Sequence, residues 1–149
     1  MYKHILVSTD GSEVAQKGVD HGLSLAKTLG ARVTLITVTE RYPIAMGGLG
    51  AEWVPTATDI AAFQEGQARN AEQILAPAKI AAEKLGVEVK TLHVPDAYAA
   101  EAIVDVAKAE DCSLIVMASH GRRGLGRLLL GSQTSEVLTH SPVPVLVVR

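Results

Sequence analysis

The stretch "SLIVMASHGRRGLGRLLLGSQTS", residues 113–135, decides the fold because it joins an apolar strand to a glycine-rich turn and a helix start. The short apolar run Ser113–Ser119 is typical of a strand that is buried on both faces. Gly131–Thr134 then has the composition of a helix start. Because open α/β sheets bind ligands beyond the carboxyl ends of their strands, this stretch predicts both a fold class and the position of a site.

The rest of the chain alternates strand and helix patterns in the same way. Apolar or β-branched runs predict four more strands, at His4–Thr9, Arg32–Thr39, Val87–Val94 and within Pro142–Val148. Helical spacing of apolar residues predicts helices over Val14–Leu29, Ile60–Leu85, Tyr98–Ala109 and up to His140. Alternation of this kind predicts a single α/β domain, residues 1–149, with an open, mostly parallel five-stranded sheet and helices on both faces.

Three local features refine this prediction. Gly30 follows the first helix and is expected to end it in a left-handed conformation. Pro77 lies inside the second helix and is expected to kink or break it. Glu40–Asp59 has three glycines and two prolines without a clear period, which predicts a long loop.

Composition excludes several classes of protein. The formal net charge of −2 gives no general attraction to nucleic acid or to an anionic membrane. No apolar run approaches the roughly 18 residues of a membrane span, and the amino terminus lacks the layout of a signal peptide. Cys112 is the only cysteine, so no intramolecular disulfide forms. We therefore expect a cytoplasmic protein with no nucleic-acid or membrane partner.

The glycine-rich turn matches neither of the two common phosphate-binding motifs. Gly121 and Gly126 have the Walker A gap, but Arg127 and Leu128 stand where that motif has lysine and a hydroxyl residue. The dinucleotide fingerprint also fails, because its last glycine position holds Leu129 and the turn follows the fourth strand rather than the first.

The residues of the turn still suit an anion. Glycine at position 121 lets backbone N–H groups approach an oxyanion closely. The helix start at Gly131–Thr134 offers free N–H groups, the positive end of a dipole and two hydroxyls. Three arginines, Arg122, Arg123 and Arg127, add positive charge. The same residues also fit a flexible loop with solvated arginines and a simple helix cap, and the pattern alone leaves both interpretations open.

Beyond these patterns, the chain resembles the universal stress protein family. That family's nucleotide-binding signature is Gly, two residues, Gly, nine residues, then Gly-Ser/Thr. Gly121, Gly131 and Ser132 match it, and Ala118 stands in place of the first glycine. The segments "KHILVSTDGSE" (3–13) and "SPVPVLVV" (141–148) also resemble the family, so the resemblance covers the whole chain. It implies the strand order 3-2-1-4-5 and the binding of ATP.

The resemblance also implies which residues surround the nucleoside. Asp10 would lie near the ribose and near a Mg²⁺ ion carried by the nucleotide, which makes it the one metal-contacting residue. Ser8 would border the nucleotide at the end of the same strand. Val38 would offer backbone groups to the adenine edge, and Met117 and Ala118 would line the ribose.

The phosphate contacts implied by the resemblance come from the turn and from the helix start that follows it. They are Gly121, Gly131, Ser132, Gln133 and Thr134, to which Arg122 is added for its charge and position. Alanine in place of the first signature glycine, at position 118, would disturb binding only if the backbone there needs a positive φ. An extended conformation, expected directly after "LIVM", would accommodate alanine at little cost.

Two neighbouring residues, Ser119 and His120, resemble part of a catalytic triad. Neighbours on an extended segment point in opposite directions, so we do not expect a nucleophilic pair there. His120 is instead expected to hydrogen-bond within the loop or to contact a phosphate. We therefore assign no catalytic residue.

The last strand raises the question of assembly. Val143–Val148 would be an edge strand in the family order, and a bare apolar edge invites aggregation. The family commonly buries this edge in a two-fold dimer, which implies a homodimer here. The functional prediction is an ATP-binding stress regulator or sensor with slow or no hydrolysis. The alternatives are a dimer of the same fold that binds no nucleotide and works through protein contacts, and a true nucleotide hydrolase.

Overall fold

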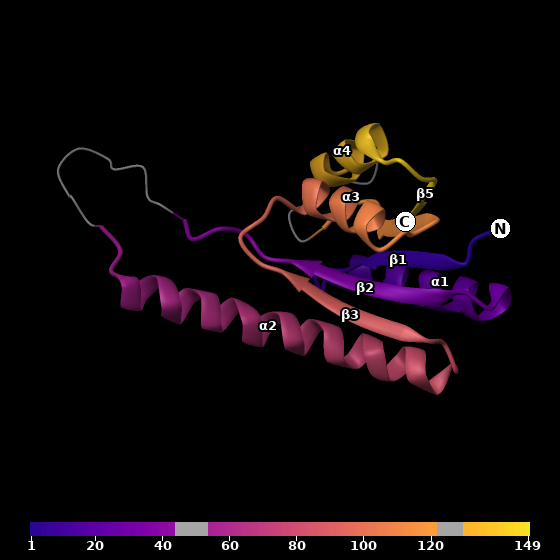
Figure 1. Ribbon diagram of the computed structural model, residues 1–149, viewed down its shortest axis with the longest axis horizontal. Coiled ribbons are helices and arrows are strands. Elements are labelled where there is room, and N and C mark those ends of the chain that lie inside the picture. The colour runs from indigo at the N-terminus through magenta and orange to yellow at the C-terminus, as the bar shows by residue number, and fades with distance from the viewer. Residues whose placement is uncertain (44–53, 122–129) are drawn as a thin grey trace.

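The computed structural model describes residues 1–43, 54–121 and 130–149, and in them five strands alternate with four helices (Figure 1). The strands are β1 (His4–Ser8), β2 (Arg32–Val38), β3 (Val89–Val94), β4 (Leu114–Ala118) and β5 (Val145–Val148). The helices are α1 (Glu13–Leu29), α2 (Ala57–Lys84), α3 (Ala99–Ala109) and α4 (Ser132–His140). All strand pairs are parallel, and their order is β3-β2-β1-β4-β5, which confirms the predicted fold class and order.

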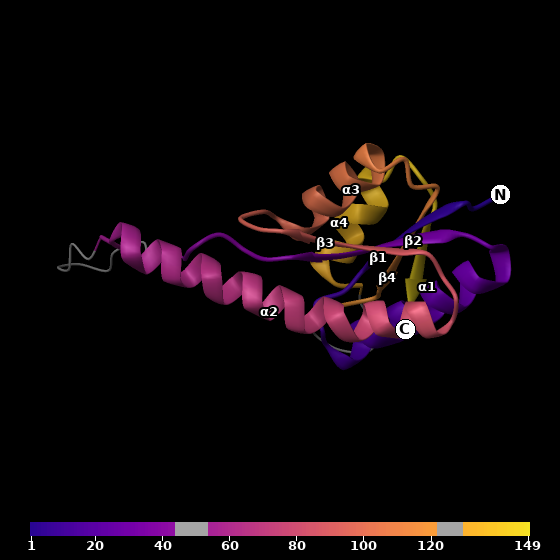
Figure 2. The same cartoon turned by 60° about the horizontal axis from the view of Figure 1, so that its bottom comes forward.

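Helices cover both faces of the sheet, which explains why the central strands are apolar throughout. Figure 2 shows α1 and α2 on one side and α3 and α4 on the other. Alternate residues of β1 serve the two cores: Val7 packs toward α1 and α2, whereas Leu6 packs toward α3 and α4. β4 follows the same rule with Val116 and Ile115, and all five of its residues are buried.

Helix α1 begins and ends where its sequence predicts. The Ser12 hydroxyl accepts the Ala15 N–H at 3.2 Å and caps the first turn. Gly30 ends the helix at a φ of 64°, the left-handed conformation that glycine adopts without strain, which confirms that prediction.

Helix α2 differs from the prediction in two ways. It begins three residues earlier than expected, at Ala57, because Thr56 and Asp59 form a reciprocal capping box. It also continues past Pro77, so the predicted break is wrong. Pro77 is exposed, and water can bind the carbonyl group that loses its partner there. The earlier start shortens the predicted loop Glu40–Asp59, of which residues 44–53 lie outside the described part of the chain.

The outer strands are shorter than predicted. β3 begins at Val89 because the N–H of Val87 still bonds the Ala82 carbonyl and belongs to the end of α2. β5 begins at Val145 rather than at Pro142, although the Pro144 carbonyl already accepts the Ile115 N–H at 3.0 Å. A proline has no N–H group to donate to the ladder, which delays the regular strand. None of the helices in the described residues has the length and apolar composition needed to cross a membrane.

At the amino end of β1, His4 is buried with both ring nitrogens engaged. Nδ1 lies 2.9 Å from the Glu110 carbonyl oxygen, and Nε2 lies 2.8 Å from the Thr34 hydroxyl oxygen. Because a carbonyl can only accept, Nδ1 carries the proton, and Nε2 of the neutral ring accepts from Thr34. Burial, followed by the positive charge of Arg32, lowers the pKa of His4.

His4 should therefore make the protein less stable in mild acid. Its pKa is lower in the folded state than in the unfolded state, so its stabilising contribution is complete above about pH 6.5 and is lost as the pH falls through the window below that value. We expect His4→Gln to be less stable than the wild type at neutral pH, and to lose less stability on acidification. Urea denaturation across this pH range measures the free energy of unfolding of both proteins. Parallel pH profiles of that free energy would contradict the assignment of the acid sensitivity to His4.

Candidate functional site

The candidate site lies at the carboxyl ends of β1 and β4, where two predicted residues meet. Asp10 follows β1 and Gly121 follows β4, and a Cβ atom added to Gly121 would lie only 2.7 Å from Asp10 Oδ2. The other carboxylate oxygen, Oδ1, accepts the Ser12 N–H at 2.9 Å and fixes the turn before α1. The side chain of Asp10 is thus held against the residue that the signature requires to be glycine.

The amino terminus of α4 forms the second part of the site. Gly131 is its N-cap residue, and its N–H donates to the Ser119 carbonyl at 2.8 Å. No side chain in the described residues caps this helix, so the N–H groups of its first turn remain available to an anion. The exposed hydroxyl of Ser132 stands at the first helical position.

Position 131 requires glycine because it lies close to the backbone of residues 119 and 120, and not because its own backbone conformation is unusual. Its φ is −59°, which any residue adopts. A Cβ atom there would nevertheless lie 3.2 Å from the Cα of His120 and 3.4 Å from the Ser119 carbonyl oxygen. The start of α4 therefore packs directly on the backbone that leaves β4.

The side chains of Gln133 and Thr134 are engaged away from the predicted phosphate position. The buried Thr134 hydroxyl lies 3.1 Å from the carbonyl oxygens of both Ala118 and Ser119 and donates to this pair, which ties α4 to the end of β4. Gln133 Oε1 accepts the Ala100 N–H at 2.8 Å and caps α3, whose own N-cap residue makes no side-chain cap. Both side chains are therefore engaged in contacts within the protein, and the predicted contacts of these two residues with phosphate stay a prediction.

Ala118, the departure from the signature, is accommodated without strain. It is the last residue of β4 and pairs with Val148, so its backbone is extended as the sequence predicts. Gly18 of α1 packs on it: a Cβ atom at Gly18 would lie 3.3 Å from the Ala118 nitrogen. Met117 is buried in the core beneath α3 and α4.

Val38 directs its backbone groups toward the site. The Ile36 carbonyl accepts the Thr9 N–H on the β1 side at 3.0 Å, and the Thr39 N–H donates to β3. Because alternate residues of a strand face opposite neighbours, Val38 faces the β1 side, at the point where β1 has ended with Ser8. The predicted contact of its backbone with an adenine edge stays a prediction.

Ser119 and His120 do touch, contrary to the prediction that they point apart. The Ser119 hydroxyl lies 3.1 Å from Nδ1 of His120. The chain is leaving the strand here, so the alternation of an extended segment no longer applies. Ser119 is buried, and in the described residues no third side chain orients the imidazole as a triad requires. The contact confirms that His120 hydrogen-bonds within the loop.

Other expectations concern metals and charge. No group of three or more His, Cys, Asp or Glu side chains in the described residues could hold a metal ion. The predicted contact of Asp10 with a nucleotide-bound Mg²⁺ stays a prediction. Arg122, with Arg123 and Arg127, lies outside the described part of the chain.

Sequence reasoning missed Gly18 and the cap formed by Gln133. The four-residue spacing of Gly18 and Gly22, which marks one face of α1, was the available signal for the former.

An open parallel sheet with a helix start at its carboxyl edge, uncapped within the described residues, has the architecture of the open α/β proteins that bind ligands at this edge. The model of the universal stress protein family matches residues 1–149. Universal stress protein MJ0531 of Methanocaldococcus jannaschii is 35% identical over 149 residues, which are 100% of this chain and 83% of that protein. The chain therefore belongs to the universal stress protein family.

Solved structures show the same fold. MJ0577, also from Methanocaldococcus jannaschii, superposes with a TM-score of 0.82 at 30% identity, over 99% of this chain and 96% of that one. The universal stress protein from Archaeoglobus fulgidus in complex with dAMP has a TM-score of 0.66 at 21% identity, over 99% of this chain and 98% of that one.

Proposed function

We propose that this chain binds ATP with Mg²⁺ at the carboxyl edge of the sheet and acts as a nucleotide-dependent stress regulator or sensor with slow or no hydrolysis. The observation that carries the proposal is the start of α4. It is uncapped within the described residues, it begins at a glycine that no larger residue can replace without moving backbone, and it stands at the end of β4.

The phosphate contacts follow from this geometry. Free N–H groups and the dipole of α4 favour a polyanion, and the Ser132 hydroxyl can add a donor. Gly121 has no side chain and lies against the carboxylate of Asp10, where a Cβ atom would lie 2.7 Å from Asp10 Oδ2. The backbone at Gly121 and Gly131 would hold the phosphate chain, with the Ser132 hydroxyl and, from the sequence prediction, Arg122 as further contacts.

The nucleoside would lie over the ends of β1 and β2. The backbone of Val38 would contact the adenine edge, Ser8 and Ala118 would border the ribose, and Met117 would support this surface from the core beneath. A relative of the same fold has been solved with dAMP, so the fold accommodates an adenine nucleotide. When bound, Mg²⁺ would neutralise charge on the phosphates, and Asp10 is placed to contact it.

Slow or absent hydrolysis is proposed because Asp10 and His120, the titratable side chains near the site in the described part of the chain, are held in structural contacts. Asp10 accepts the Ser12 N–H, and His120 contacts the Ser119 hydroxyl. Neither is arranged as a base for an attacking water. Turnover well above about one per minute would instead support a nucleotide hydrolase.

We also propose a homodimer through Val143–Val148. β5 is the last strand of the sheet and pairs only with β4 among the described strands. Its outer edge is apolar, with the Leu146 side chain 39% exposed, and pairing with a second copy would cover it. The same dimer without nucleotide binding is the second candidate function, in which protein contacts alone carry the activity.

Equilibrium dialysis with ATP, in the presence and absence of Mg²⁺, tests the proposed function directly. We expect saturable binding below about 1 mM, a range accessible to a few charged contacts. Failure to bind at that concentration would leave the second candidate. Mass spectrometry of nucleotide retained through native purification gives an independent answer.

Asp10→Asn should weaken ATP binding in the presence of Mg²⁺ by about tenfold, the equivalent of one charge-assisted contact, and should change Mg²⁺-free binding much less. The amide keeps an oxygen that can accept the Ser12 N–H, so the turn is retained. Asp20→Asn, an equal charge change at an exposed position of α1, is the matched control. Equal affinities of the two variants for Mg-ATP would remove Asp10 from the site.

A further inference from the structure

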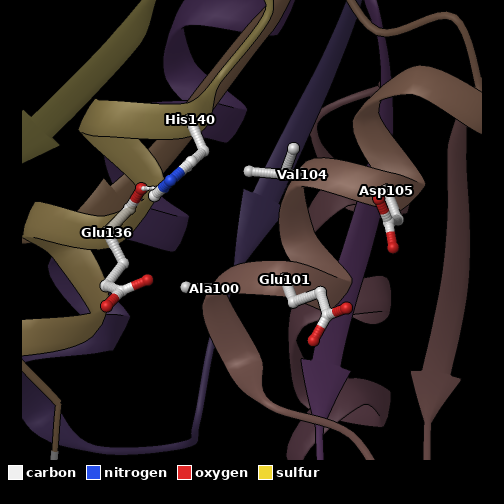
Figure 3. A pocket seen from close by; sticks show the side chains of 6 residues that line it. All are labelled: Ala100, Glu101, Val104, Asp105, Glu136 and His140. Carbon is white, nitrogen blue, oxygen red and sulfur yellow. Dashed lines mark hydrogen bonds between the residues drawn. The ribbon is translucent and has the colours of Figure 1, made fainter.

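A surface groove of about 280 Å³ runs between α3 and α4, on the helices that cover one face of the sheet (Figure 3). None of the residues that line it belongs to the proposed nucleotide site. We call it the α3–α4 groove. It is lined by Ala100, Glu101, Val104, Asp105, Glu136 and His140.

The floor of the groove is apolar. Ala100 and Val104 lie one helical turn apart on α3 and are 7% and 6% exposed. A floor of this kind suits an aliphatic chain lying along it. Figure 3 shows the floor residues between the acidic side chains of the two helices.

The walls of the groove carry unbalanced negative charge. Glu101 and Asp105 stand on α3 and Glu136 on α4, all three exposed. In the described residues, the ion pairs of the protein involve none of these carboxylates. Glu101 and Asp105 are spaced i,i+4, where like charges destabilise a helix by a few tenths of a kcal/mol. A cation bound between them would relieve that repulsion.

The two helices that form the groove are fixed relative to each other. Gln133 of α4 accepts the Ala100 N–H at 2.8 Å, at the end of the groove where α3 begins. His140 closes the lining on α4, and its Nδ1 is bonded to the Glu136 carbonyl at 2.9 Å. A groove that exists before binding needs little reorganisation to receive a partner.

We propose that the α3–α4 groove is a docking site for a basic segment of a protein partner. The aliphatic stem of an arginine or lysine would lie on Ala100 and Val104, with its cationic head among the three carboxylates. Long basic side chains combine these two chemistries, since they bury their stems and keep the charge at the rim. The charge of the walls repels nucleic acid and anionic lipid, which leaves a basic protein segment as the occupant.

Fluorescence anisotropy with a labelled synthetic peptide tests the proposal on the intact protein without nucleotide, so a failure of ATP binding does not affect the result. The probe is an amphipathic helical peptide of leucine, alanine and arginine. The triple variant E101Q, D105N and E136Q should bind it about tenfold more weakly, since each exposed pair contributes modestly. Val104→Thr, which makes the floor more polar, should weaken binding about threefold without changing its salt dependence.

The matched control is the triple variant E65Q, E72Q and E83Q. It removes the same charge from exposed positions of α2, on the opposite side of the sheet, and should keep the wild-type affinity. Equal losses in both triple variants would reduce the effect to net charge and overturn the proposal. Spermine binding in place of the peptide at lower concentration would assign the groove to small polyamines, and self-association lost only in the groove variant would assign it to a second copy. Either outcome also overturns it.

Discussion

Gly131→Val should lower the affinity for ATP by at least about a hundredfold, because it disturbs the backbone donors on which the proposed phosphate binding rests. The obstacle is backbone: a Cβ atom at this position would lie 3.2 Å from the Cα of His120. Relieving that contact moves the first turn of α4 away from β4 and stretches the Gly131–Ser119 hydrogen bond. Isothermal titration with ATP and Mg²⁺ measures the loss.

Two further variants keep this prediction testable. Gly131→Ala introduces only the Cβ atom and should show an intermediate loss, which covers the case in which valine prevents folding. Gly66→Ala is the control, because no described atom lies within 4 Å of a Cβ atom built there. Circular dichroism confirms that each variant is folded. Wild-type affinity in a folded Gly131→Val protein would show that the start of α4 does not hold the phosphates.

Most of the fold follows from the chain's own pattern. Uninterrupted apolar runs such as "HILVS" and "LIVMA" are stable only in a sheet covered on both faces, and β1 and β4 are the central strands that these runs form. The sequence pattern gave a wrong prediction at a position where one local rule is overridden by another. Pro77 breaks the rule for helix interiors, yet α2 continues because that turn faces water. Strand order came from the resemblance to the family, since periodicity contains no information about which strands are neighbours.

The sequence predicts where the candidate site lies, but it predicts the roles of the side chains there only in part. The spacing of Gly121 and Gly131 located the turn, and the extended backbone of Ala118 agrees with its place after an apolar strand. The roles of Gln133 and Thr134 could not be read from the sequence. Both stand at a helix start, where their types suggest ligand or cap, and only the folded chain shows that their side chains reach Ala100 and the end of β4.

Gly22→Ala and Gly66→Ala make the same chemical change and should differ in stability by up to about 3 kcal/mol. Both gain up to about 1 kcal/mol from the higher helix propensity of alanine. At Gly66 nothing opposes that gain. At Gly22 the new Cβ atom would lie 2.6 Å from Cγ2 of Val7 and 3.6 Å from Cγ1 of Val116. Overpacking a filled core costs about 1–3 kcal/mol, so this variant is expected to be destabilised by up to about 2 kcal/mol.

Val7 cannot move aside cheaply, because it is fully buried in the central strand and its side chain is stiff at χ1. Combining Gly22→Ala with Val7→Ala removes the obstructing methyl groups and should therefore cost less than the sum of the two single changes. Denaturation of the four proteins of this cycle in guanidinium chloride measures the coupling energy. Additive effects would mean that α1 can shift away from the sheet. In that case the close packing of α1 on β1 and β4, which also positions Gly18 against Ala118, would not be rigid enough to support the ribose side of the site.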